Sequence, residues 1–176
     1  MRMIRWMHFL YILVLLVLDS IFNSIFMQLG LTSITFVSSL HFLGLMLLTQ
    51  NDSPTESIVK AVLLGVWMDL CHIGSFPLFF VSYSVTIAIL RVWDRYIGTS
   101  TLEFLVLAVI GLFIKEMLIF GMLPLVKGVS YSLITFISTR TLWVIIGNLI
   151  LLPIAMTLYK WMHRLIMQRV QNLYMR

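Results

Sequence analysis

The stretch from Val66 to Leu90 decides the fold: V-W-M-D-L-C-H-I-G-S-F-P-L-F-F-V-S-Y-S-V-T-I-A-I-L. It is apolar over most of its length, but it holds one carboxylate, Asp69, and it is interrupted at Gly74 and Pro77. A charge in hydrocarbon is costly, so an acid inside a membrane segment marks a functional or assembly site. Glycine and proline favour a turn, and proline is well placed in the first turn of a helix. The stretch therefore predicts two short membrane helices joined by a tight turn, with Pro77 opening the second.

The composition of the whole chain agrees with a membrane location. Of its 176 residues, 61% are hydrophobic and 11% are charged, whereas a soluble domain has about 25% charged residues. No polar stretch is long enough to form a soluble domain, so we expect one transmembrane domain over residues 1–176. The formal charge of +5 comes from Lys and Arg at the ends of apolar runs, which is typical of topology signals rather than of nucleic-acid binding.

A membrane-spanning helix needs about 20 apolar residues for a hydrocarbon core of about 30 Å. Six runs qualify, two of them short, which predicts an all-α protein with six transmembrane helices at about 6–27, 33–49, 58–73, 76–92, 102–123 and 133–161. Ser53 and Pro54 have the pattern of a helix start before the third run. Pro153 lies inside the last run and predicts a kink, with the C-terminal part lying along the cytoplasmic surface.

The distribution of Lys and Arg predicts the orientation. With six spans and the N-terminus inside, most of the cations fall on the cytoplasmic side: Arg2, Arg5, Lys60, Arg91, Arg95, Lys160, Arg164, Arg169 and Arg176. Lys127 and Arg140 fall outside, and Lys115 lies within the membrane. Basic residues favour the cytoplasmic side, so we expect both termini there.

Five ionisable residues from four predicted helices share one depth in the outer half of the membrane, when positions are converted at about 1.5 Å per residue. They are Asp19, Asp69, Lys115, Glu116 and Arg140. One interpretation pairs the two cations with the three acids across the bundle. The other lets the cations reach the outer interface individually and lets Asp69 reach water. Lys115 and Glu116 point about 100° apart on a helix, which predicts different partners for them.

The sequence gives little support to metal binding or catalysis. His72 lies one turn after Asp69, a spacing that suits metal or proton chemistry, but His8, His41 and His163 lie on other segments and complete no ligand set. No motif of a hydrolase, a zinc peptidase, a P-loop or a dinucleotide site occurs. We therefore expect no enzyme activity, no catalytic residues, no metal and no cofactor.

The pattern from Gly65 to Tyr83 resembles the MreD family of rod shape-determining membrane proteins. Members typically show a glycine, an aspartate four residues later, a short turn with glycine and proline, and a following aromatic. The matching residues are Gly65, Asp69, Gly74, Pro77 and Tyr83. The length, the six short spans and the basic tail agree with that family over the whole chain, although the prolines often found in the first two spans of the family are absent.

This resemblance implies a non-enzymatic subunit of the cell-elongation (rod) complex in the bacterial inner or plasma membrane. Such a subunit binds the bitopic protein MreC, and through it links cytoplasmic MreB filaments to RodA and a class B penicillin-binding protein. It thereby helps to organise peptidoglycan synthesis and cell shape. Asp69 is then a structural or partner-contact residue. The family is also similar in fold to the S components of energy-coupling-factor vitamin transporters.

A substrate-binding S component is the alternative function, and an unrelated intramembrane enzyme or channel is a third. S components usually dock through an Ala-xxx-Ala surface on the first helix, whereas residues 11–22 here read Y-I-L-V-L-L-V-L-D-S-I-F. These bulky residues favour the scaffold. A scaffold predicts exposed surfaces for partner helices, and a transporter predicts an outward-facing ligand pocket lined by aromatic and charged groups.

Overall fold

A computed structural model of the chain describes residues 2–29, 34–50, 52–72, 74–93 and 101–174. All regular secondary structure in these ranges is helical, which confirms the predicted all-α class. The elements are α1 (Arg2–Gln28), α2 (Leu40–Thr49), α3 (Pro54–Cys71), α4 (Leu78–Trp93), α5 (Thr101–Lys127), α6 (Leu133–Phe136), the π-helical turn η1 (Ile137–Thr141) and α7 (Leu142–Tyr174).

Three segments are long and apolar enough to cross a bilayer: Trp6–Gln28, Thr101–Lys127 and Leu133–Arg169. Two further apolar helices, at Leu40–Thr49 and Leu78–Val92, are shorter. These helices indicate an integral membrane protein. Six full spans are not confirmed, because α2 is too short and α3 includes Glu56, Lys60 and Asp69 in its 18 residues.

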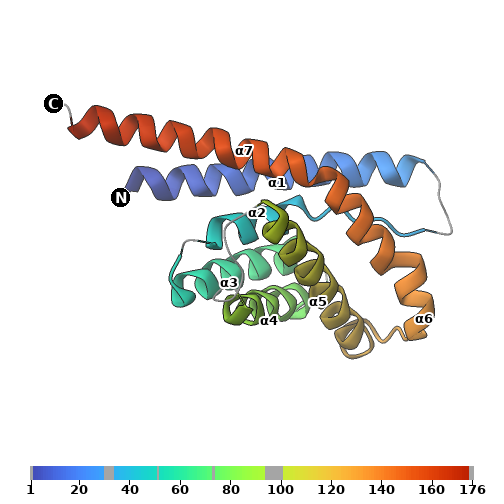
Figure 1. Ribbon diagram of the computed structural model, residues 1–176. Coiled ribbons are helices and arrows are strands. Elements are labelled where there is room, and N and C mark those ends of the chain that lie inside the picture. Colours follow the sequence, from blue (N-terminus) through green and yellow to red (C-terminus); the bar gives the residue numbers. More distant parts are fainter. Residues whose placement is uncertain (1, 30–33, 51, 73, 94–100, 175–176) are drawn as a thin grey trace.

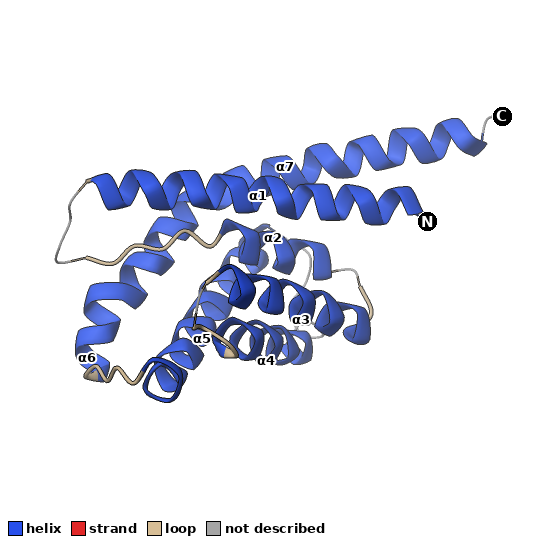
Figure 2. Ribbon diagram, turned by 180° about the vertical axis from the view of Figure 1, so that it is seen from behind, coloured by secondary structure: helices blue, strands red, loops and turns tan. Residues whose placement is uncertain are grey.

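The helices form two groups, which Figure 1 shows from one side. Helices α1 and α7 lie along one side of the molecule, and α2 to α5 gather on the other. The first residues of α1 and the last residues of α7 lie at the same end, so the two helices run antiparallel (Figure 1). Seen from behind, α3 and α4 form a hairpin beside α5 (Figure 2).

The second predicted helix, at 33–49, is wrong in its first part. Residues 34–39 are not helical, and α2 begins only at Leu40 and has ten residues. This part of the sequence reads I-T-F-V-S-S, and β-branched residues favour extended backbone, while serine favours positions at a helix start. The apolar run is therefore an extended segment followed by a short helix, rather than one continuous span.

The last predicted helix extends further than expected and has two irregular points. Its first turns pass through η1, and Pro153 lies inside α7, where it cannot donate a backbone hydrogen bond. In Figure 1 the chain rises from α6 and then turns to lie beside α1. The part after Pro153 packs on α1, because the Tyr11 hydroxyl donates to the Ala155 carbonyl at 3.0 Å and Met162 is buried.

The hairpin of α3 and α4 forms much as the sequence predicts. The Ser53 side chain accepts a hydrogen bond from the Glu56 backbone N–H at 3.3 Å, so α3 begins at Pro54 as expected. Gly74 in the turn has φ of +71°, a value that favours glycine. Helix α4 begins at Leu78, two residues later than the predicted start at 76, and the Pro77 carbonyl accepts from the Val81 N–H at 3.0 Å.

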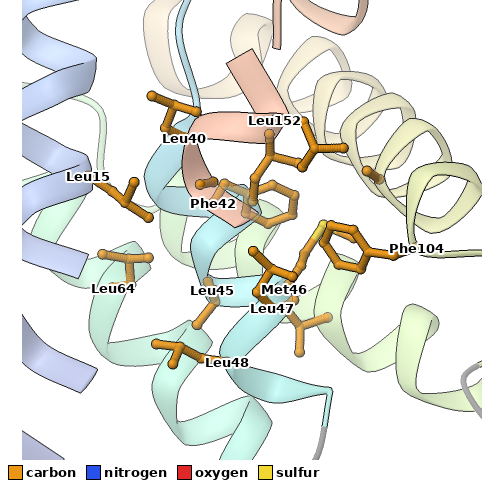
Figure 3. Packing of buried hydrophobic residues seen from close by; sticks show 14 of the residues in the cluster. Leu15, Leu40, Phe42, Leu45, Met46, Leu47, Leu48, Leu64, Phe104 and Leu152 are labelled. Carbon is orange, nitrogen blue, oxygen red and sulfur yellow. The ribbon is translucent and has the colours of Figure 1, made fainter. Parts of the chain in front are cut away.

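Helix α2 is the centre of the hydrophobic core, since every residue from Leu40 to Thr49 is buried. Figure 3 shows the surrounding helices contributing apolar side chains to it: Leu15 from α1, Leu64 from α3, Phe104 from α5 and Leu152 from α7. A helix that is apolar on all sides needs neighbours on all sides. The fold meets this need by placing the short apolar helix α2 between longer helices.

Candidate functional site

The polar side chains inside the protein gather at the N-terminus of α2. The Asp19 carboxylate of α1 accepts hydrogen bonds from the backbone N–H groups of Leu40 and His41, both at 2.8 Å. It also accepts from the Ser38 hydroxyl and contacts Nδ1 of His41. The first N–H groups of a helix have no partner within the helix and carry partial positive charge. Asp19 therefore caps α2 from a neighbouring helix.

His41 links this cap to α4. Its Nε2 atom lies 2.6 Å from the Tyr83 hydroxyl. With Asp19 ionised, Nδ1 of His41 bears the proton and Nε2 accepts from Tyr83. An acid, an imidazole and a hydroxyl in this order occur in hydrolases, but the Tyr83 side chain is only 1% exposed. The three buried groups connect α1, α2 and α4.

Side chains from α1 and α7 satisfy the backbone of the extended segment before α2. Asn23 Oδ1 accepts from the Ser38 N–H and Asn148 Oδ1 accepts from the Ser39 N–H, both at 2.6 Å. The Asn148 side-chain amide donates to the Val37 carbonyl at 2.9 Å. Non-helical backbone at membrane depth is tolerated only where protein covers it and satisfies its polar groups. The broken second segment meets that condition through these amides.

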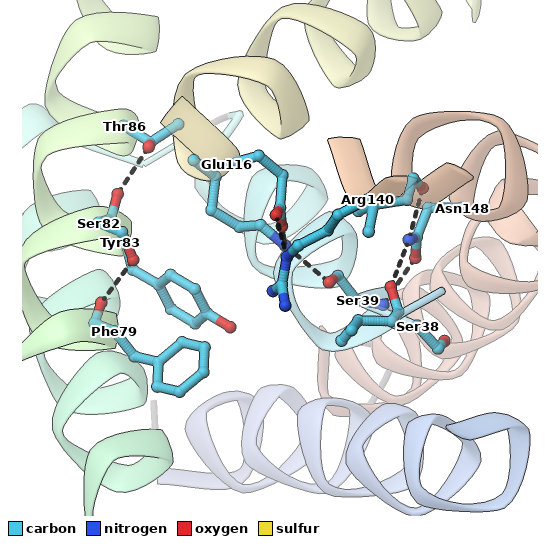
Figure 4. Close-up of polar contacts among 12 residues, drawn as sticks. Ser38, Ser39, Phe79, Ser82, Tyr83, Thr86, Glu116, Arg140 and Asn148 are labelled. Atoms are coloured by element: carbon cyan, nitrogen blue, oxygen red, sulfur yellow. Dashed lines mark hydrogen bonds and ion pairs between the residues drawn. The ribbon is translucent and has the colours of Figure 1, made fainter. Parts of the chain in front are cut away.

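Lys115, Glu116 and Arg140 form a second part of the polar core (Figure 4). Lys115 Nζ lies 3.0 Å from Glu116 Oε1, and Arg140 Nε donates to Glu116 Oε2 at 2.8 Å. Lys115 also donates to the Ser39 hydroxyl at 2.7 Å, which joins this group to the start of α2. The expectation that Lys115 and Glu116 need different partners is wrong, because the flexible lysine side chain turns back to its neighbour.

The π-helical turn η1 positions Arg140. A π-helical turn widens the helix and is frequent at functional sites. The Thr139 carbonyl in this turn accepts from the Thr35 N–H at 2.8 Å, so η1 also holds the extended segment. The buried hydroxyl of Thr141 has no hydrogen-bond partner in the described part of the chain.

The structure thus brings four of the five predicted ionisable residues into one connected layer. Asp19 and Glu116 supply two negative charges, and Lys115 and Arg140 supply two positive charges, so the layer is neutral when His41 is neutral. Burying charges at this depth requires such pairing.

Asp69 has a different set of contacts. Its two carboxylate oxygens accept from the Phe79 N–H at 3.0 Å and the Phe80 N–H at 2.8 Å. These groups lie in the first turn of α4, so Asp69 caps that helix from the end of α3. Neither Lys115 nor Arg140 pairs with it among the described residues. The interpretation that pairs both cations with all three acids therefore holds only for Glu116.

Each of the other motif residues has a structural position in the same hairpin. An atom added as Cβ at Gly65 would lie 2.7 Å from Cα of Phe80, so glycine lets α4 approach α3 closely. Gly74 and Pro77 form the turn and the start of α4. Tyr83 lies further along α4 and points toward the polar core (Figure 4).

Sequence reasoning missed the side chains that complete the polar core: Asn23, Ser38, Ser39, His41 and Asn148. Asparagine and histidine inside long apolar runs are themselves costly in a membrane, and this signal would have found Asn23, His41 and Asn148. The role of the two serines becomes visible only when the position of the helix break is known.

A large pocket and a cluster of metal-ligating side chains are the features expected of a small-molecule or metal site. The hollow lined by Met46, Ile87, Phe104 and neighbouring residues of α2, α4 and α5 has a volume of about 20 Å³. That is room for about one water molecule, whereas ligand pockets have volumes of about 300–1,000 Å³. In the described ranges, no three His, Cys, Asp or Glu side chains are grouped to hold a metal ion.

The fold and the polar core define a helical membrane protein with a buried, charge-paired layer. Comparisons with protein-family models, with curated proteins and with solved structures found no match for the chain.

Proposed function

We propose that the chain is a non-enzymatic subunit of the bacterial cell-elongation complex, which binds MreC and thereby helps to organise peptidoglycan synthesis. The hairpin of α3 and α4 is the observation that carries the proposal. The motif residues of the MreD-like pattern work together in it: Asp69 caps α4 and Gly65 permits close helix packing. A rigid hairpin suits a subunit whose task is to present helix faces to partners.

The filled polar core also supports an assembly role. Tyr83, Lys115 and Glu116 are each at most 2% exposed. Their polar atoms contact other side chains of the polar core: Tyr83 contacts His41, Lys115 contacts Ser39 and Glu116, and Glu116 also contacts Arg140. The protein's own side chains therefore fill the polar core. RodA, a class B penicillin-binding protein and MreB are the further partners that we propose, reached through MreC.

One observation favours the alternative, a substrate-binding S component. Transporters often bind substrates at the N-terminus of a broken membrane helix, and α2 is such a helix. Here, however, Asp19 already occupies that N-terminus with both carboxylate oxygens. An external anion would have to displace a buried internal one, so we favour the scaffold.

An affinity pull-down from the native membrane tests the proposed function. Tagged wild-type protein is solubilised in mild detergent beside Asp69→Ala, Asp69→Asn and the control Glu56→Ala, which changes an exposed acid on the same helix. We expect MreC-like and wall-synthesis proteins with wild type and the control, and less of them with Asp69→Ala. Asp69→Asn keeps one acceptor oxygen and should lie between.

One result would contradict the scaffold, and another would contradict the proposed role of Asp69. Recovery of the ATPase subunits of a transporter would support the S component, and vitamin binding by the purified protein would then be measured. Equal recovery of the elongation proteins with all four forms would show that the Asp69 cap has no part in assembly.

A further inference from the structure

We propose that Arg140 binds a carboxylate carried by a transmembrane helix of a partner protein. The inference rests on the proposed role as a partner-binding subunit, but not on the identity of the partners. It defines the chemistry of one contact: an acidic side chain in the membrane interior binds the two terminal nitrogens of this guanidinium, which form its unused edge.

The guanidinium of Arg140 is only partly used. It has five N–H donors, and Nε donates to Glu116 Oε2. Glu116 cannot offer both oxygens to Arg140, because its Oε1 atom faces Lys115 at 3.0 Å. Within the part of the chain that the structure describes, the two terminal nitrogens have no hydrogen-bond or ion-pair partner. They point away from Glu116 in Figure 4.

Arg140 is partly exposed, and its terminal nitrogens are not among the buried side-chain atoms without a hydrogen-bond partner, which in the described residues are Glu116 Oε1 and Thr141 Oγ1. The Arg140 side chain is 23% exposed, whereas those of Lys115 and Glu116 are 2% and 0% exposed. The buried Glu116 holds the guanidinium at Nε, and the centre of the Phe136 ring lies 5.7 Å from its central carbon. A fixed arginine fork matches the two oxygens of a carboxylate.

The depth of the site favours a helix-borne acid over a lipid headgroup. Glu116 lies 15 residues after Thr101 and 11 before Lys127, the ends of α5, which is about 22 Å and about 16 Å along the helix. Half of the hydrocarbon core is about 15 Å thick. Arg140 itself lies seven residues after Leu133, the start of α6, which is about 10 Å along the helix. The contact is thus in the outer half of the apolar layer, below the level of the lipid phosphates.

An exposed face of α7 next to Arg140 has the spacing that a partner helix needs. Trp143, Ile146, Ile150 and Ile154 are exposed and recur every three or four residues. Such a face alone would simply meet lipid. Arg140 lies one turn before Trp143 and has unpaired N–H donors. A partner helix that packs along this face therefore gains a polar contact with Arg140, which lipid chains cannot provide.

Designed peptides provide a direct test with the full-length protein. The probes are leucine-rich transmembrane peptides of one length with Glu, Gln or Leu at the central position, labelled with a fluorophore. Energy transfer to labelled protein is measured in phosphatidylcholine vesicles. We expect wild type to bind the Glu peptide about tenfold more tightly than the Gln peptide. Arg140→Gln should abolish this preference, and the control Lys127→Gln should keep it.

Several outcomes would overturn the proposal. One is equal binding of the Glu and Gln peptides by wild type, and another is a preference that survives Arg140→Gln. A preference erased in vesicles of phosphatidylglycerol would identify a lipid phosphate as the occupant instead.

Two further measurements separate the explanations. Gel filtration shows whether Arg140→Gln folds. If it does not, Arg140→Lys keeps the pair with Glu116 but lacks the fork, and an unchanged preference in that variant would contradict the proposal. The peptide assay contains no native partner, so its result does not depend on the pull-down. A failed pull-down would count against the proposed function and would not affect the peptide result.

Discussion

At the scale of single residues, Asp19 has the most connected position in the polar core. It receives donors from Ser38, Leu40 and His41, and all of these groups are buried. Removing a buried charged acceptor leaves its hydrogen-bond donors without a partner, which lowers the free energy of unfolding by about 3–5 kcal/mol. No other described side chain supplies an acceptor to the N–H groups of Leu40 and His41.

We therefore predict that Asp19→Ala lowers the free energy of unfolding by about 3 kcal/mol. Asp19→Asn keeps one acceptor and should lose less. Unfolding in mixed micelles titrated with a denaturing detergent measures the difference. Ser20→Ala, at an exposed position next in the chain, serves as the control and should match wild type. An Asp19→Ala protein as stable as this control would show that Asp19 does not hold α2.

At the scale of elements, the pair of α3 and α4 depends on the absence of a side chain at Gly65. An added Cβ would lie 2.7 Å from Cα of Phe80 and 2.8 Å from the carbonyl oxygen of Phe79. Both are backbone atoms, so the two helices would have to separate. That separation would also lengthen the hydrogen bonds from Asp69 to the start of α4.

We predict that Gly65→Ala destabilises the protein by about 1–3 kcal/mol, the usual cost of overpacking. Gly121 lies in α5 with no atom within 4 Å of an added Cβ. Gly121→Ala should therefore be neutral or slightly stabilising, because alanine favours helix. The same detergent titration compares the two. A Gly65→Ala protein that unfolds like Gly121→Ala would mean that the hairpin has room to adjust.

The sequence was informative about elements whose signals are local. Apolar length predicted α1, and the Ser53 cap with Pro54 predicted the start of α3, because both depend on neighbours in the chain. The break before α2 was not predicted, because residues 34–39 contain neither glycine nor proline to mark it. Their extended form depends on Asn23 and Asn148, which lie far away in the sequence.

The candidate site shows the same limit. Counting residues along helices predicted a shared depth for Asp19, Lys115, Glu116 and Arg140, and the structure connects them. It did not predict which atoms meet, because flexible side chains decide that. The contact between Lys115 and Glu116, neighbours in the chain, illustrates this point.

At the scale of the whole molecule, the antiparallel pair of α1 and α7 fixes the two chain ends relative to each other. The start of α1 and the end of α7 lie at the same end of the pair (Figure 1). Both helices belong to segments that are long enough to cross a bilayer. From Pro153 to the C-terminus the sequence contains no acidic residue, and the side chains of Lys160 and Arg164 are exposed. Basic residues at a helix end favour the cytoplasmic side.

We therefore predict that both termini lie in the cytoplasm. Fusions to a fluorescent protein that folds only in the cytoplasm should be bright at either end. Fusions to alkaline phosphatase, which is active only outside, should be inactive there. Phosphatase fused after Leu29, beyond the end of α1, should be active and serves as the control. Phosphatase activity at one terminus alone would be incompatible with α1 and α7 crossing the membrane side by side in opposite directions. Activity at both termini would be compatible with the antiparallel helix pair, but it would mean that the pair crosses in the opposite orientation. The prediction from the basic residues would then be wrong, because the helix pair alone does not determine which side its ends face.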